Sequence, residues 1–344
     1  EGHLHDSGAT SGRTSIRPCP GPEHEVDMTS RSATDSHATH RAGLLLGVSA
    51  YAIWGFFPLY FPLLDPASPL EILCERFVFS LVFMAVLLTA TRGWTRLVSV
   101  VRDVRIVLML SAAAALIAVN WGTYIWAVNN GNVVEASLGY FVNPLVLVVL
   151  GVLVLGERLR RLQWTAVGIA TAAVVVLTVG LGRLPWIALA LALSFAGYGL
   201  IKKLAGVDPQ SSLTVETAVA TPFALAYLAH LQLTGGLVLG HGPTSTTVLL
   251  ACTGVVTAVP LLLFGGAANR IPLTTMGLLQ YLTPSIQFVI GVWIDGEAMS
   301  PARWAGFVIV WVALAVFSYD GLRESRRGVR AAAVGGIDEV EAPV

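Results

Sequence analysis

One stretch of the sequence, residues 132–155, reads NVVEASLGYFVNPLVLVVLGVLVL and decides the class of protein. Its only charged residue is Glu135, near the start of the stretch. An apolar run of this length spans the hydrocarbon core of a bilayer when it folds as a helix. The whole chain agrees, because 12% of its 344 residues are charged and its mean hydropathy is +0.72, whereas soluble domains carry about 25% charged residues. The sequence therefore predicts an integral membrane protein.

Nine further stretches have a similar length and an apolar composition. Only short segments connect them, so the sequence leaves no room for a soluble domain between them. Backbone polar groups in lipid need partners within the protein, and a bundle of helices provides them. We therefore predict an all-α membrane protein with ten transmembrane helices. The nine further stretches are 42–64, 70–91, 105–128, 162–181, 184–203, 212–232, 246–269, 273–294 and 302–320.

Basic residues are distributed unevenly between the predicted loops. If the N-terminus is placed in the cytoplasm, most of the 21 lysines and arginines fall on the cytoplasmic side. Only Arg183 and Arg303 fall outside, and Arg76 lies within a predicted helix. Since the cytoplasmic loops of membrane proteins are enriched in basic residues, the sequence predicts that both termini are cytoplasmic.

The two ends of the chain differ from its apolar part. Residues 1–40 are rich in Ser, Thr, Gly, Pro and His and contain five of the seven histidines. A metal-binding tract and a disordered, solvated tail are the two interpretations, and we expect the tail and no metal site. Residues 321–344 are expected to form a second cytoplasmic tail. The chain starts at Glu1, and we expect Met28 to be the natural start, with residues 1–27 as upstream sequence.

Several classes of function are excluded by the composition and the motifs. The formal net charge is zero, so the chain lacks the basic excess typical of nucleic-acid binding. The three cysteines, Cys19, Cys74 and Cys252, are too far apart for a metal site and too few for a disulfide framework. The sequence contains no nucleotide-binding P-loop and no zinc-protease or serine-hydrolase motif. We therefore expect no cofactor and no enzyme activity.

The chain repeats itself after 140 residues. This shift brings Pro144 onto Pro284 and Trp164 onto Trp304. The repeat unit contains five helices, and because five is odd, the second unit enters the membrane from the opposite side. Inverted repeats of this kind are typical of secondary transporters, whose halves rock around a site near the midplane. The predicted units are residues 41–181 and 182–320.

Several motifs carry a resemblance to a known family. They include AYAIWG at residues 50–55, EASLGYFVNP at residues 135–144 and LGER at residues 155–158. With these motifs the sequence resembles the RarD-type branch of the EamA family, in the drug/metabolite transporter superfamily. The resemblance implies ten helices in two EamA repeats and export of small organic compounds across the bacterial inner membrane. Glu75 departs from the family pattern, which has a histidine beside the arginine, and this departure puts a coupling role for that position in doubt.

Charged residues within a membrane are costly, so each one in a predicted helix is a candidate site. Glu71 and Glu75 lie four residues apart on one face of the second helix, with Arg76 about 100° round from that face. Arg76 either extends to the headgroups or places a charge at the mouth of a cavity, paired with Glu71 or Glu135, where it would select anionic or zwitterionic substrates. We favour the second interpretation. Glu71, Glu75 and Glu135 are the candidates for proton coupling, and capping of its own helix is an equal alternative for Glu135.

Three further glutamates are expected to have structural roles. Glu216 lies in the first turns of the seventh helix, where capping together with Thr214 is plausible. Glu157 and Glu297 each follow a glycine at a helix end, and a turn that caps the next helix explains both.

Polar and aromatic residues in the middle of the bundle are stronger candidates for a substrate pathway. Hydrogen bonds between helices are one explanation for such groups, and a cavity with aromatic walls and a few fixed polar groups is the other. Pro144 and Pro284 are expected to kink their helices beside the cavity. Trp54 and Tyr198, related by the repeat, would close it from the two halves. The predicted pathway residues are Trp54, Arg76, Asn120, Trp121, Tyr124, Tyr140, Asn143, Tyr198, Gln280 and Tyr281.

These observations lead to one functional hypothesis and two alternatives. We expect a secondary transporter, an exporter of small organic metabolites or drugs, that works by alternating access of two inverted halves. The alternatives are a passive facilitator and a membrane accessory protein or enzyme without transport. The expected partners are a small-molecule substrate and membrane lipid, with a homodimer left open and no nucleic acid.

Overall fold

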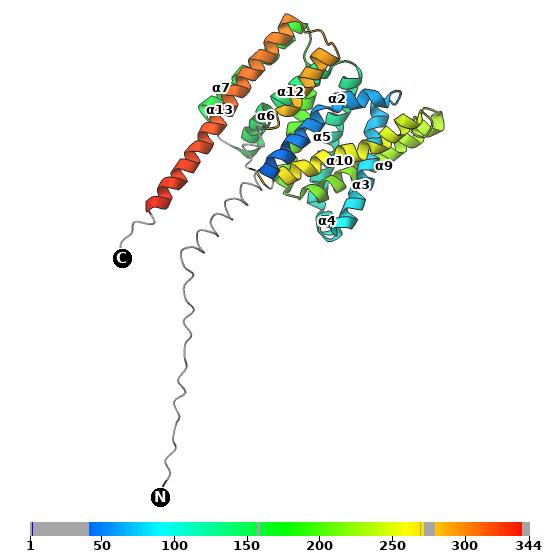
Figure 1. Ribbon diagram of the computed structural model, residues 1–344, viewed down its shortest axis with the longest axis horizontal. Coiled ribbons are helices and arrows are strands. Elements are labelled where there is room, and N and C mark those ends of the chain that lie inside the picture. The colour runs from blue at the N-terminus through cyan, green and yellow to red at the C-terminus, as the bar shows by residue number, and fades with distance from the viewer. Residues whose placement is uncertain (1, 3–40, 157–158, 269, 272–278, 339–344) are drawn as a thin grey trace.

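The computed structural model describes residues 2, 41–156, 159–268, 270–271 and 279–338. Within these residues the regular structure is helical throughout (Figure 1). The first helix, Arg41–Gly55, is followed by two short helices, α2 (Phe57–Tyr60) and η1 (Phe61–Leu64). The later helices are α3 (Pro69–Thr91), α4 (Trp94–Val101), α5 (Val104–Asn129), α6 (Val133–Leu155), α7 (Arg161–Leu181), α8 (Trp186–Ala205), α9 (Pro209–Thr234), α10 (Thr244–Ala268), α12 (Leu282–Val289), the π-helical turn η2 (Ile290–Ile294) and α13 (Pro301–Asp338).

Seven of the described helices are long and apolar enough to cross a membrane. An eighth span results if Arg41–Gly55 and Phe57–Leu64, which meet at an angle of 43°, are counted together. The other two sequence predictions, 184–203 and 273–294, overlap with the shorter apolar helices Trp186–Lys202 and Leu282–Ile294. The predicted helical membrane fold is confirmed in this coarser form.

Helices α3 and α9 start with the same local design, 140 residues apart. Ser68 caps α3 and accepts a hydrogen bond from the backbone N–H of Glu71 at 3.2 Å. Asp208 caps α9 and accepts one from the backbone N–H of Ser211 at 3.0 Å. In both helices the residue after the cap is a proline, which suits the first turn because it has no N–H to satisfy. The local sequence therefore starts these two helices in the same way.

Helices of the two sequence halves alternate in the bundle. α8 packs against α5 and α6, and α3 packs against α9 and α10. The first helix lies against α10 and α12, because the rings of Trp54 and Phe264 are 6.0 Å apart and the Gln287 side chain donates to the Trp54 carbonyl at 3.3 Å. α7 packs against α13 at one side of the bundle, away from α3, α9 and α10 (Figure 1). Each half therefore buries its apolar faces largely against the other half.

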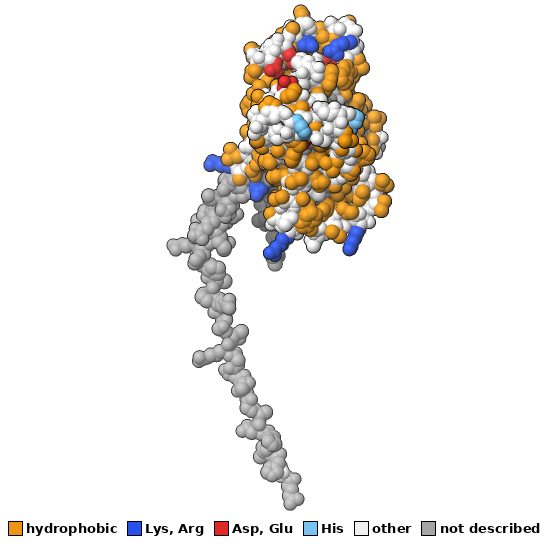
Figure 2. All heavy atoms as spheres, turned by 90° about the vertical axis from the view of Figure 1, so that its right-hand side faces the viewer, with side chains coloured by type: hydrophobic (Ala, Val, Ile, Leu, Met, Phe, Trp, Pro, Cys, Tyr) orange, Lys and Arg blue, Asp and Glu red, His pale blue; other side chains and the backbone are white. Residues whose placement is uncertain are grey.

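The surface of the bundle separates charged from apolar side chains. On the face in Figure 2 the charged side chains gather towards the two ends, and apolar side chains cover most of the area between them. Leu108, Val179 and Phe223 illustrate this surface, with exposed fractions of 65%, 78% and 76%. An apolar surface of this extent suits lipid rather than water. The chain is a multi-pass membrane protein.

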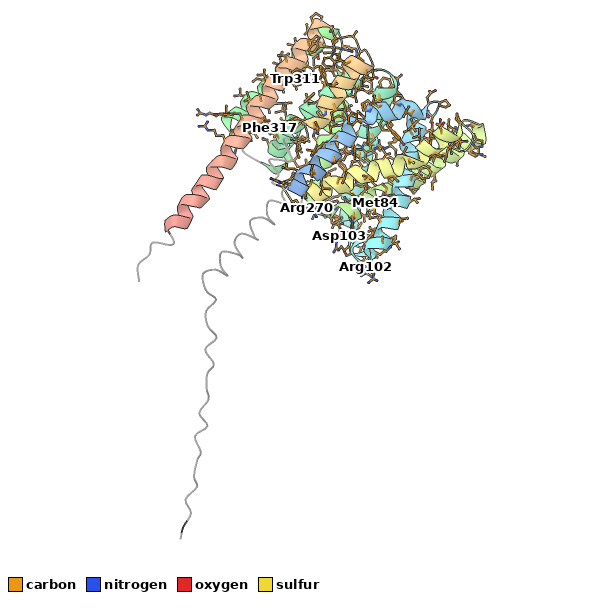
Figure 3. All side chains as sticks on the ribbon, in the orientation of Figure 1. Met84, Arg102, Asp103, Arg270, Trp311 and Phe317 are labelled. Carbon is orange, nitrogen blue, oxygen red and sulfur yellow. The ribbon has the colours of Figure 1, made fainter. Side chains whose placement is uncertain are left out.

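Helix α4 and the end of α13 lie on different flanks of the bundle. Figure 3 shows Arg102 and Asp103 in the turn after α4, where Asp103 caps α5 by accepting from the backbone N–H of Arg105 at 2.9 Å. Trp311 and Phe317 lie on α13 (Figure 3), and the Trp311 ring contacts Phe288 of α12 with centroids 5.5 Å apart. The candidate residues lie in the helices between these flanks.

Local structure differs from the sequence predictions at two places. Pro284 lies in the first turn of α12 rather than in the middle of a helix, and the first turn needs no N–H donor from that position. Residues 321–338, expected as a tail, continue α13 as a helix. Pro144 does lie inside a helix, α6. Apart from Gly2, the N-terminal segment lies outside the described residues, as does Glu157.

Candidate functional site

Arg76 is a buried cation in the second turn of α3. Its side chain is enclosed by protein, with 3% of the residue exposed. Its Nε donates one hydrogen bond, to the Thr257 hydroxyl of α10 at 3.0 Å. The two terminal Nη groups make no hydrogen bond or ion pair with any residue that the structure describes. The guanidinium therefore presents an unpaired fork of N–H donors inside the bundle.

Aromatic rings surround the Arg76 guanidinium. Its central carbon lies 4.3 Å from the ring centroid of Trp121, 5.4 Å from that of Phe61 and 5.6 Å from that of Phe57. Ring faces attract a cation and replace part of its lost hydration. Arg76 does not extend to the surface, because 3% of the residue is exposed, and the expected pairing with Glu71 or Glu135 is wrong, because both carboxylates have other partners.

Glu71 and Glu135 are occupied by structural interactions. The Glu71 carboxylate is buried and accepts from the backbone N–H groups of Val238 at 2.7 Å and Leu239 at 3.3 Å. Glu135 forms an ion pair with Arg183 at 2.9 Å and accepts from the backbone N–H of Ile187 at 3.2 Å. Glu135 lies in the first turn of its own helix α6, as one of the two readings expected, and its carboxylate also caps the first turn of α8. Both carboxylates connect segments distant in sequence.

Glu75 differs from these two carboxylates. It is 1% exposed, and neither of its carboxylate oxygens has a hydrogen-bond partner among the described residues. It precedes Arg76 directly, so the same turn of α3 carries an unpaired acid and an unpaired cationic fork. Unpaired ionisable groups in a membrane protein are costly and mark functional positions. Among the three candidates for proton coupling, Glu75 is the one whose carboxylate is free to act.

Asn120 and Tyr140 form a polar connection between three helices. The Asn120 amide of α5 donates to the Leu191 carbonyl at 3.0 Å and to the Ser194 hydroxyl at 3.1 Å, both in α8. The Tyr140 hydroxyl of α6 donates to the Asn120 side-chain oxygen at 3.1 Å. The nearby Tyr124 hydroxyl is buried without a described partner. The structure thus brings Asn120, Tyr124 and Tyr140 of the predicted pathway residues together.

Five aromatic side chains form a continuous series of ring contacts, which we call the ring column. Successive centroids are 6.0 Å, 5.6 Å, 6.0 Å and 6.0 Å apart. Arg76 lies at its first ring, and its last ring reaches the buried carboxylate of Glu216, to which Tyr198 donates at 3.0 Å. The column contains, in order, Phe61, Tyr124, Tyr140, Phe195 and Tyr198.

The remaining predicted pathway residues are not members of the ring column, although Trp54 and Trp121 pack against the apolar cluster that contains Phe61 and Tyr124. Trp54 packs on Tyr51, with centroids 5.6 Å apart, and on Phe264. Tyr281 contacts the apolar cluster of α6, α7 and α13. Gln280 is half-buried and makes no side-chain hydrogen bond with a described residue. Asn143 is buried, and its side-chain oxygen has no described partner. No ring contact joins Trp54 and Tyr198 among the described residues, and their closure of one cavity stays a prediction.

Two glutamates make different contacts from those expected. Glu216 does not cap α9 with Thr214; its carboxylate instead accepts from side chains of α8 and from Ser212, while Asp208 is the cap. Glu297 accepts from the backbone N–H of Val134 at 3.1 Å and so caps α6, not the helix that follows it. Burial raises the pKa of Glu297 to about 7, an increase limited by this backbone hydrogen bond.

Sequence reasoning missed several residues around Arg76 and the ring column. Thr257 and Phe195 lie in apolar stretches where a single hydroxyl or ring gives no periodic signal. Gln287 is buried, donates to the Trp54 carbonyl and keeps an unpaired side-chain oxygen. A search for amides inside apolar stretches would have found Gln287, whereas Thr257 becomes visible only through its contact with Arg76.

Comparisons with known proteins agree with this architecture. Residues 41–179 match the EamA-like transporter family. Protein RarD of Streptomyces exfoliatus is 52% identical over 287 residues, which cover 83% of this chain and 91% of that protein. The chain belongs to the EamA family. The resemblance to its RarD-type branch, inferred from the residue motifs, is confirmed.

Two further comparisons place this EamA protein among known sequences and folds. An uncharacterized transporter of Pseudomonas aeruginosa is 44% identical over 300 residues, which cover 84% of this chain and 97% of that protein. A solved crystal structure aligns with a TM-score of 0.52 and 20% identity, covering 83% of this chain and 99% of the other. At that identity the second likeness supports the fold alone.

Proposed function

We propose that this EamA protein is a secondary transporter that exports small organic anions or zwitterions across the inner membrane of a bacterium by alternating access. The observation that carries the proposal is the unpaired guanidinium fork of Arg76, which is enclosed by Trp121, Phe61 and Phe57. The chain's likeness to Protein RarD and to a transporter supports transport as the activity.

The chemistry of Arg76 suits an anionic group. A guanidinium presents parallel N–H donors that match the two oxygens of a carboxylate or of a phosphate. In surroundings of low polarity such a charge-assisted pair is stronger than in water. The rings of Trp121 and Phe61 would pack against a flat part of the same molecule. The favoured substrate therefore combines an anionic group with an aromatic or other flat apolar part.

The contact pattern supports two inverted halves of five spans each. An exchange of the halves maps the first helix onto α8, α5 onto α10 and α6 onto α12. Under this exchange, the packing of α8 on α5 and α6 corresponds to the packing of the first helix on α10 and α12. The structure contains both sets of contacts. The pairs α3 with α9 and α7 with α13 map onto themselves. Ten spans with both termini in the cytoplasm fit this symmetry and the basic loops.

Proton coupling through Glu75 is the part of the proposal that depends on a single side chain. Its carboxylate has no described partner and lies beside Arg76 in the sequence. A substrate anion at Arg76 and a charged Glu75 would repel each other. If a substrate anion at Arg76 and the negative charge on Glu75 exclude each other, the transporter exchanges substrate for a proton. Passive facilitation is the alternative, in which Glu75 stays in one protonation state.

Flux into proteoliposomes tests this function. Purified protein faces a panel of amino acids, amphenicols and small cationic drugs, with and without an imposed pH gradient. We expect uptake of anionic or zwitterionic members that follows the gradient, and Glu75→Gln should keep the uptake but remove its dependence on the gradient. Uptake that ignores the gradient in the unaltered protein would support the facilitator. Cysteines at position 140 that react from one side only would favour an accessory protein or enzyme.

A further inference from the structure

Lys202 lies at the end of the ring column that is opposite to Arg76. Its Nζ is 5.2 Å from the ring centroid of Tyr198, the last ring. At the first ring, the Arg76 guanidinium is 5.4 Å from the centroid of Phe61. The column therefore runs between two cations, each placed against its terminal ring. No motif in the sequence assigns a role to Lys202.

The two cations differ in their counterions. Arg76 has none among the described residues. The Lys202 amine donates to the Glu216 carboxylate at 2.7 Å and to the Ser212 hydroxyl at 2.6 Å. Glu216 is 1% exposed, whereas the Lys202 side chain keeps 24% of its surface exposed. A carboxylate of the protein thus occupies, at Lys202, the position that a substrate anion would occupy at Arg76.

The groups around Glu216 form a complete carboxylate-binding site. Lys202 and the Ser212 hydroxyl, at 2.6 Å, donate to one carboxylate oxygen, and the Tyr198 hydroxyl donates to the other at 3.0 Å. These donors come from α8 and from the first turn of α9, and they serve any carboxylate placed there. Charge-assisted hydrogen bonds of this kind are the strong ones.

We propose that Lys202 is a second binding site for the anionic group of the substrate, and that Glu216 is the carboxylate that occupies this site in the present conformation. This inference rests on the proposed transport function. An organic anion that moves along the ring column from Arg76 exchanges with Glu216 at Lys202. Because one carboxylate replaces another, the amine keeps a charged partner, and the displaced Glu216 takes up a proton, since a buried unpaired carboxylate costs much free energy.

Binding of benzoate tests the exchange without requiring transport. Benzoate carries one carboxylate and one ring, and calorimetry on the full-length protein in lipid nanodiscs measures its affinity. Glu216→Gln removes the negative charge that competes for the Lys202 amine and should tighten binding about tenfold, the effect of one charge-assisted hydrogen bond. Lys202→Met should weaken binding by a similar factor, and the double variant should behave like Lys202→Met. Lys202→Arg should retain binding.

Two controls separate this inference from a structural ion pair. Lys203→Met removes the neighbouring lysine, about 100° round the helix, and should leave the affinity unchanged. If the pair only holds α8 against α9, Glu216→Gln and Lys202→Met would change the affinity in the same direction. Such a result, or the absence of benzoate binding in every form, overturns the inference. A correct binding pattern without any flux in proteoliposomes would instead overturn the proposed transport and leave the site intact.

Discussion

Arg76 and Glu216 lie equally far from the starts of α3 and α9, 140 residues apart in the sequence, and carry opposite charges. Each is covered by two side chains that lie four residues apart in the segment before its helix, and Arg76 is also covered by Trp121. Phe57 and Phe61 cover Arg76, and Tyr198 and Lys202 cover Glu216. The first pair consists of rings without hydrogen-bonding groups, whereas both members of the second pair donate to the carboxylate. Equivalent positions in α3 and α9 therefore hold an unpaired charge at Arg76 and a neutralised charge at Glu216.

The largest difference between these positions should appear in stability. Glu216→Leu leaves the Lys202 amine without its counterion, and loss of one partner of a buried pair costs about 3 kcal/mol or more. Arg76→Met removes a cation that has no counterion, and the methionine packs on the same rings. The free energy of unfolding should therefore change by less than about 1 kcal/mol. Denaturant unfolding in detergent micelles checks both values. Equal losses would mean that Arg76 has a structural partner after all.

Transport, unlike stability, should depend strongly on Arg76. Arg76→Gln keeps a polar side chain of similar length but removes the charged fork, and we expect flux of anionic substrates to fall about 100-fold, the value of a lost charge-assisted pair. Arg96→Gln, an exposed arginine of α4, serves as the matched control and should keep full flux. Retained flux in Arg76→Gln, with folding verified by circular dichroism, would contradict the assigned role.

A smaller effect should follow from the hydrogen bond that orients Arg76. Thr257→Val removes the hydroxyl that accepts from Nε while keeping the volume of the side chain. The guanidinium stays but is less well held, so the KM for transport should rise about fivefold, equivalent to one ordinary hydrogen bond. Thr253→Val, one turn earlier in α10 and without contact to Arg76, is the matched control. Equal KM values for the two variants would show that Thr257 does not position Arg76.

The smallest expected effect is a change of stability with pH, caused by Glu297 at the N-terminus of α6. Burial raises the pKa of Glu297 to about 7 in the folded protein, above its ordinary value of 4.5. The contribution of this group to stability is therefore fully present below the unfolded pKa and is lost as the pH rises through the folded pKa. Thermal unfolding between pH 5 and pH 8 should show this decline, and Glu297→Gln should reduce it. An unchanged pH profile in the variant would mean that another group is responsible.

The sequence predicted the helical membrane fold because its information is local. Apolar runs give the helices, and residues such as Ser68 and Asp208 mark their starts. The middle of the candidate site could be predicted for the same reason. Asn120, Tyr124 and Tyr140 are polar groups within apolar stretches, where they need a specific explanation.

The partners of the charged residues could not be predicted in this way. Glu71 binds backbone N–H groups of a loop 167 residues further along the chain, and Arg76 binds a hydroxyl 181 residues away. Backbone groups carry no sequence signal, and an isolated threonine such as Thr257 resembles many others. The spacing of charges indicates which groups must find a partner, whereas the packing of the two halves decides which partner each one meets.

Lys202 is one of only two lysines in the chain, which makes it a rare nucleophile as well as a cation. An amine reacts with acylating reagents when it is unprotonated and free, and the Lys202 amine is held by a carboxylate and a hydroxyl. Its acylation therefore has to wait for release from Glu216. The rate of acylation at Lys202, followed by peptide mass spectrometry, would report how often that end of the ring column opens. The measurement needs no known substrate.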